Sequence, residues 1–135
     1  MIKKTNLLYI ALAVFLLFLL CSCETHRKLD VPGLTDFEAN IKKEYPYVKR
    51  ISCILNNPAS YSVRCTLSKH IVPEKMTDLI ATLKEYALTD VFNKYNESFT
   101  SDSRIVFLEF YVGTKYYFRY RYDTGGYDEP IWVID

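Results

Sequence analysis

Glycine, proline and histidine are scarce in this chain, and their scarcity argues against several classes of function. The 135 residues include only four glycines, five prolines and two histidines. No glycine-rich stretch has the pattern of a phosphate-binding loop. Neither His26 nor His70 stands at metal-ligand spacing from the pair Cys53 and Cys65. The sequence therefore predicts neither a metal nor a cofactor.

An excess of charge of one sign is also lacking. The chain has 17 basic and 16 acidic residues, for a formal net charge of +1. Nucleic-acid and anionic-lipid surfaces need a clustered basic excess, and no such cluster is visible along the chain. The sequence gives no indication of a nucleic-acid partner.

Signs of catalysis are missing as well. His70 has no serine or cysteine nucleophile motif with it, so a surface histidine at a strand end is the better interpretation. The acidic segment 123–129 lacks the alternating oxygen ligands of a calcium loop and is interpreted as a solvated Gly-Gly turn. No catalytic residue is predicted, and the balance tilts away from an enzyme.

What the chain does contain is an export signal. Lys3 and Lys4 precede an unbroken apolar run from Leu7 to Leu20, and the small residue Ser22 stands before Cys23. This is the layout of a secretory signal peptide. The ending, Leu20 to Cys23, resembles the lipobox of bacterial lipoproteins.

The resemblance covers residues 1–23 only and implies an address, not an activity. It implies a lipid on Cys23, an anchor in a membrane of the bacterial cell envelope, and a domain outside the cytoplasm. Two alternatives remain: an uncleaved membrane helix, and cleavage without lipidation. Residues 24–33 have no apolar periodicity and are interpreted as a tether, which leaves 34–135 as a single domain.

The pattern of the domain predicts two successive units, each a helix followed by a β-hairpin. A capping box at Thr35 and Glu38 opens a helix that ends before Pro46, and two alternating runs over 51–67 predict a hairpin. Pro73 opens a second helix, 89–103 reads as irregular, and a second hairpin turns at Gly113. With 131–134 as a possible edge strand, the prediction is an α+β fold: a four- to five-stranded antiparallel sheet with two helices on one face.

Cys53 and Cys65 fall on the inward face of the first hairpin. Pairing Ile51 with Leu67 places the two cysteines directly opposite each other. Export would allow oxidation, so a disulfide between them is favoured. The alternative is two reduced core cysteines that behave as small apolar residues.

The second hairpin carries the candidate binding surface. Pairing residues whose numbers sum to 228 gathers its apolar residues on one face, whereas a strict two-residue turn gives a sum of 227 and places Arg119 and Arg121 among them. The first register is preferred. It leaves Phe107, Tyr111 and Tyr117 on the opposite face beside Arg119 and Arg121, where a protein partner or a second copy of the chain could bind. Alternatively, the C-terminal segment covers these rings with Trp132.

A lipid-anchored, non-enzymatic binding module is therefore the expected function, with an inhibitor, immunity factor or accessory factor of the envelope as examples. A structural envelope lipoprotein without a soluble ligand is one alternative. An enzyme of unrecognised type is the other.

Overall fold

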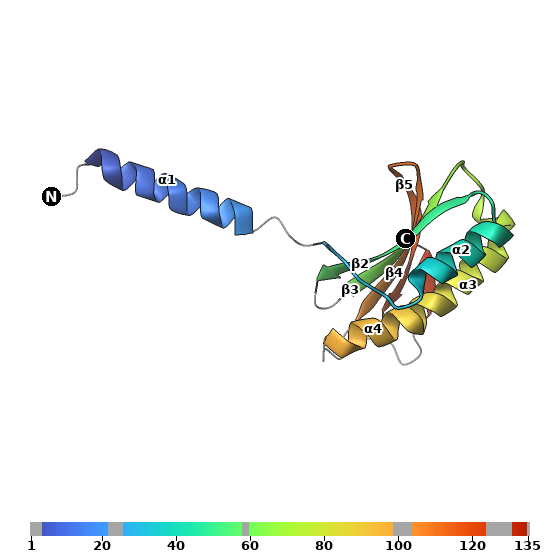
Figure 1. Ribbon diagram of the computed structural model, residues 1–135. Coiled ribbons are helices and arrows are strands. Elements are labelled where there is room, and N and C mark those ends of the chain that lie inside the picture. Colours follow the sequence, from blue (N-terminus) through green and yellow to red (C-terminus); the bar gives the residue numbers. More distant parts are fainter. Residues whose placement is uncertain (1–3, 22–25, 58–59, 99–103, 124–130, 135) are drawn as a thin grey trace.

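The computed structural model describes residues 4–21, 26–57, 60–98, 104–123 and 131–134. The N-terminal apolar run forms a helix, α1 (Lys4–Cys21), which stands apart from the folded part of the chain (Figure 1). No helix among the described residues is long and apolar enough to cross a membrane. Cys23 lies outside the described residues, so its lipidation stays a prediction.

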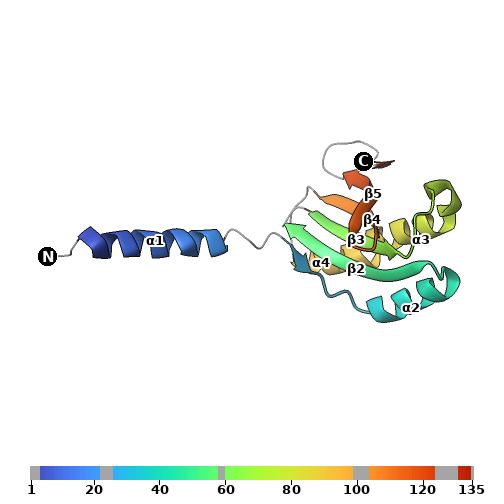
Figure 2. The same ribbon diagram turned by 90° about the horizontal axis from the view of Figure 1, so that it is seen from above.

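The folded part is an α+β domain, as predicted, built on one six-stranded sheet. The strands lie side by side in chain order. They are β1 (Arg27–Lys28), β2 (Val48–Asn57), β3 (Ser60–Leu67), β4 (Ile105–Val112), β5 (Lys115–Asp123) and β6 (Trp132–Ile134). The helices of the folded part gather on one side of the sheet, and no described helix covers the other face (Figures 1 and 2). We call this uncovered side the open face.

The centre of the sheet differs from the prediction. Strands β3 and β4 pair in parallel, from Ser60 beside Ile105 to Leu67 beside Val112. The other neighbouring pairs are antiparallel. A parallel pair needs a long crossover, and the connection from β3 to β4 contains the helices that follow the first hairpin. The expectation of an all-antiparallel sheet was therefore wrong at this one junction.

The helices follow the predicted stripes with three corrections. Helix α2 (Leu34–Glu44) has Gly33 as its N-cap residue, with a φ of 79°. The predicted N-cap, Thr35, lies inside the helix. A 3-10 turn, η1 (Pro73–Lys75), leads into α3 (Thr77–Leu88). The segment predicted to be irregular contains a third helix of the domain, α4 (Asp90–Ser98).

Glu38 joins α2 to the sheet instead of capping the helix. Its carboxylate accepts a hydrogen bond of 2.8 Å from the backbone N–H of Ile51 and lies 3.1 Å from Nζ of Lys42. Burial alone would raise the pKa of Glu38, but these donors stabilise the charged form more strongly. The net result is a pKa below the ordinary value, so the carboxylate holds α2 on β2 at neutral pH.

The core lies between the helices and the inner face of the sheet. The largest fully buried side chains include Tyr61, Tyr95, Phe110 and Met76. The hydroxyl of Tyr61 donates a hydrogen bond of 2.8 Å to the carbonyl of Ala87, which ties β3 to the end of α3. The predicted inward face is therefore confirmed for the first hairpin and for most of the second, where Tyr116 was also predicted to face inward but is 52% exposed.

The predicted tether, residues 24–33, is wrong in part, because some of these residues belong to the sheet or the core. Strand β1 pairs with β2, with Arg27 beside Leu55 and Lys28 beside Ile54. Leu29 and Val31 are buried in the core. The sheet therefore begins within four residues of Cys23.

Candidate functional site

The second hairpin uses both registers that the sequence allowed. From Val106 opposite Tyr122 to Phe110 opposite Phe118, partners sum to 228, as predicted. The register then shifts, so that Tyr111 lies opposite Tyr116 and the turn is the tight two-residue one. Gly113 supplies the positive φ, 61°, at this turn. A β-bulge in β5 reconciles the two registers.

The bulge changes which tyrosine faces outward. Tyr117 was predicted on the open face, but its hydroxyl donates a hydrogen bond of 3.2 Å to the carbonyl of Ile71 and its ring lies edge-on to His70. Tyr116 takes its place, 52% exposed and edge-on to Tyr111 at 5.9 Å between ring centroids. The prediction for Tyr117 was therefore wrong.

Arginines lie over the other two predicted rings. The guanidinium of Arg119 is 4.4 Å from the centroid of the Phe107 ring, and that of Arg64 is 4.3 Å from the Tyr111 ring. Both are within the range of a cation–π contact. The two hairpins therefore form one continuous surface through the β3–β4 pair.

The C-terminal strand does not cover these rings with Trp132. Strand β6 pairs Trp132 with Tyr122, and the two rings contact each other at 5.2 Å. Lys84 of α3 lies 5.7 Å from the same indole, so Trp132 is on the helical side. The residue that β6 adds beside Arg121 is Val133.

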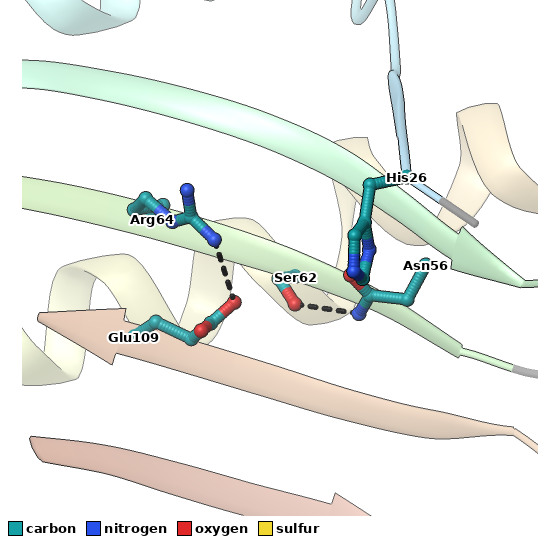
Figure 3. Close-up of polar contacts among 5 residues, drawn as sticks. All are labelled: His26, Asn56, Ser62, Arg64 and Glu109. Atoms are coloured by element: carbon teal, nitrogen blue, oxygen red, sulfur yellow. Dashed lines mark hydrogen bonds and ion pairs between the residues drawn. The ribbon is translucent and has the colours of Figure 1, made fainter. Parts of the chain in front are cut away.

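One buried carboxylate lies at the centre of the open face. Glu109 is 8% exposed and stands between Arg64 on β3 and Arg119 on β5 in the strand register. Its oxygen is 3.8 Å from a guanidinium nitrogen of Arg64 (Figure 3).

A groove of about 480 Å³ runs over β1 to β4 beside the hairpin turn. Its charged walls come from different parts of the chain: Arg27, Lys28, Arg50 and Arg64. Its other lining residues are polar or apolar, namely His26, Ser52, Ile54, Thr66, Tyr111, Gly113 and Thr114.

Polar contacts fix the N-terminal wall of the groove on the sheet. Nδ1 of His26 lies 3.2 Å from the side-chain oxygen of Asn56, whose amide donates a hydrogen bond of 2.7 Å to the Ser62 hydroxyl (Figure 3). The amide separates the imidazole from the hydroxyl, so this chain of contacts is not a nucleophile–base pair.

Cys53 and Cys65 are buried free thiols in the structure. The first hairpin pairs Cys53 with Val63 and Ile51 with Cys65, two residues away from the predicted register. The cysteines are therefore diagonal neighbours, and diagonal pairs stand farther apart than the ~4.4–6.8 Å between Cα atoms that a disulfide needs. The predicted direct pairing was wrong, and the structure contains no disulfide between them. Burial raises the pKa of both thiols to about 12.

The remaining candidates add no chemistry. Within the described part of the chain, no group of three or more His, Cys, Asp or Glu side chains could hold a metal ion. Residues 124–130 of the acidic loop lie outside the described residues. No protein-family model, curated protein or solved structure matches this chain.

Sequence reasoning missed the groove, although part of its signal was present. Arg50, Ser52 and Ile54 alternate on the outer side of β2, and Arg64 and Thr66 do so on β3. That pattern marks a solvated face. Strand β1 was not predicted. Without it, nothing in the sequence indicated that Arg27 and Lys28 lie on the sheet.

Proposed function

We propose that this chain is an exported bacterial lipoprotein, held to a membrane of the cell envelope by lipid on Cys23. Its domain is a non-enzymatic binding module that engages a protein partner through the open face. The leader pattern ending at Cys23 supports the anchor. The observation that carries the binding role is an open face on which arginines stack on aromatic rings.

The aromatic end of that face has the composition of an interface. Tyr, Phe and Arg are enriched at protein–protein contacts, where they supply large contact area and charge-assisted hydrogen bonds. Phe107 with Arg119, and Tyr111 with Arg64, form two such units on neighbouring strands. Tyr116 adds an exposed ring beside them. This set differs from the predicted one at two positions. Tyr116 has the role expected of Tyr117, and Arg64 joins the set, whereas Arg121 lies beside Val133 of β6.

Catalysis has less support than binding. In the described part of the chain, the Ser62 hydroxyl is linked to His26 only through Asn56. Ser62 is 1% exposed, and its hydroxyl accepts a hydrogen bond from the Asn56 amide. The buried thiols have raised pKa values, which suppress the nucleophilic thiolate. Within the described residues, the open face offers no pair of acid and base groups near a nucleophile.

Site-specific crosslinking tests the binding role. A photoreactive phenylalanine at position 116 should crosslink the mature chain to one discrete product in intact cells. The control position is 72, because Val72 is 49% exposed and is not part of the open face. The Tyr111→Ser variant should weaken the product formed from position 116. Equal products from both positions, or none from position 116, would contradict the proposal.

A further inference from the structure

The groove on the open face gathers positive charge that the sequence as a whole does not show. Arg27, Lys28, Arg50 and Arg64 line it, and none of the described residues that line it is acidic. These side chains come from three strands, so the concentration of charge is produced by the fold. Hydroxyl donors from Ser52, Thr66 and Thr114 lie among them. Such a set of donors fits the oxygens of a phosphate group.

Arg64 has hydrogen-bonding capacity to spare. A guanidinium has five N–H donors, and the contact of Arg64 with Glu109 spans 3.8 Å, beyond hydrogen-bond length. Its Nε is buried and has no hydrogen-bond partner among the described residues. Its packing over Tyr111 fixes the plane of the guanidinium at the wall of the groove. The Arg64 side chain is 33% exposed at the groove, so an anion there can accept hydrogen bonds from its terminal nitrogens, although not from the buried Nε.

The position of the groove along the chain indicates where the anion comes from. His26, Arg27 and Lys28 line it and begin three residues after Cys23. Three extended residues reach about 10 Å, close to the ~8 Å Debye length at physiological salt. A lipid on Cys23 therefore holds this wall of the groove at the level where headgroup charges act.

We propose that the groove binds the phosphate groups of anionic lipid headgroups in the membrane that anchors the chain. The proposal rests on the proposed function, because lipid on Cys23 supplies the proximity. A single acyl chain anchors only marginally, and a cationic surface is a recognised second signal for stable attachment. Headgroup binding would also fix the orientation of the domain, leaving Phe107 and Tyr116 for the protein partner.

The test uses the mature chain purified from membranes in a neutral detergent and titrated with dioctanoyl phosphatidylglycerol under native mass spectrometry. Dioctanoyl phosphatidylcholine is the zwitterionic comparison. Glycerol phosphate and hexaglutamate are the soluble comparisons. We expect phosphatidylglycerol to bind more tightly than each of these, since the lipid shares a micelle with the anchored chain and so has a high local concentration.

The decisive variant is Arg27→Gln with Arg50→Gln. Each cation near an anionic surface contributes roughly a fivefold change in affinity, so the double variant should bind phosphatidylglycerol roughly 30-fold more weakly. Lys43→Gln with Lys75→Gln removes the same charge from exposed sites on α2 and η1, and it should change the affinity little. Both double variants change exposed side chains, and circular dichroism checks that they are folded.

Equal affinity of the wild type and the Arg27→Gln, Arg50→Gln variant would overturn the proposal. So would equal binding of phosphatidylcholine, or tighter binding of glycerol phosphate or hexaglutamate. The same spectra report the mass of the chain and therefore the lipid on Cys23. A lipidated chain with an inactive groove would overturn this inference alone, whereas an unlipidated chain would overturn the anchor in the proposed function.

Discussion

At the residue scale, the hydroxyl of Tyr61 shows how a buried polar group ties β3 to α3. Its hydrogen bond to the Ala87 carbonyl lies in the core, where water cannot replace it. Tyr61→Phe should lower the free energy of unfolding by about 1–2 kcal/mol, since the carbonyl loses a buried donor. Chemical denaturation measures this change. Tyr111→Phe is the matched control, because the Tyr111 hydroxyl makes no hydrogen bond within the described part of the chain; an equal loss in both variants would contradict the assignment.

The two buried thiols predict a dependence of stability on alkaline pH. Their folded pKa values, about 12, lie above the ordinary value of a thiol. The neutral form is favoured in the folded state, so the stabilisation is complete below about pH 8.5 and is lost as the pH rises toward 12.

A thiol reagent at pH 8 should label neither cysteine in the folded chain and both Cys53 and Cys65 after unfolding without reductant. A chain that yields no thiols after unfolding would restore the disulfide prediction.

At the scale of elements, the bulge in β5 assigns opposite roles to adjacent tyrosines. Tyr117 packs against the loop before α3 and donates to Ile71, whereas Tyr116 is half exposed. Tyr117→Ala should therefore destabilise the fold by about 2 kcal/mol, and Tyr116→Ala by less than about 0.5 kcal/mol. Thermal unfolding of the two variants checks this order. The reverse order would show that the uninterrupted 228 register was right.

Much of each hairpin could be predicted from alternation, but its register only in part. Alternation assigned Cys53 and Cys65 to the correct face. A slip of two residues keeps every side chain on its face, so the pattern could not separate Leu67 from Cys65 as the partner of Ile51. Helix α4 was missed because Val91 and Tyr95 are its only fully buried residues among those described, too few for a helical stripe.

The candidate site was predicted less completely than the fold. Phe107, Tyr111, Arg119 and Arg121 were placed on the open face from the register of one hairpin. Their continuity with Arg64 depends on the parallel β3–β4 pair, a contact between residues 45 apart in sequence at Arg64 and Glu109. No local pattern encodes such a pairing. The same holds for the groove, whose walls need β1.

At the scale of the whole molecule, the proposed anchor at Cys23 would determine where the domain works. The intact mass of the mature chain should correspond to a sequence that starts at Cys23 and carries acyl chains. Cys23→Ala should leave the protein unprocessed or release it from membranes, because the acyl chains supply most of the attachment. Membrane fractionation measures this. A mature chain with a free, unmodified residue 24 at its N-terminus would contradict the anchor.

The parallel pair at the centre of the sheet also sets an order of events when the chain emerges N-terminus first. The first hairpin can close as soon as Leu67 is available, but β3 then waits for β4, which begins only at Ile105. During that interval an apolar strand that ends up in the core has an unpaired edge, the arrangement most prone to association between chains. We therefore expect a chaperone to bind the exposed edge of β3 until β4 has emerged and paired with it.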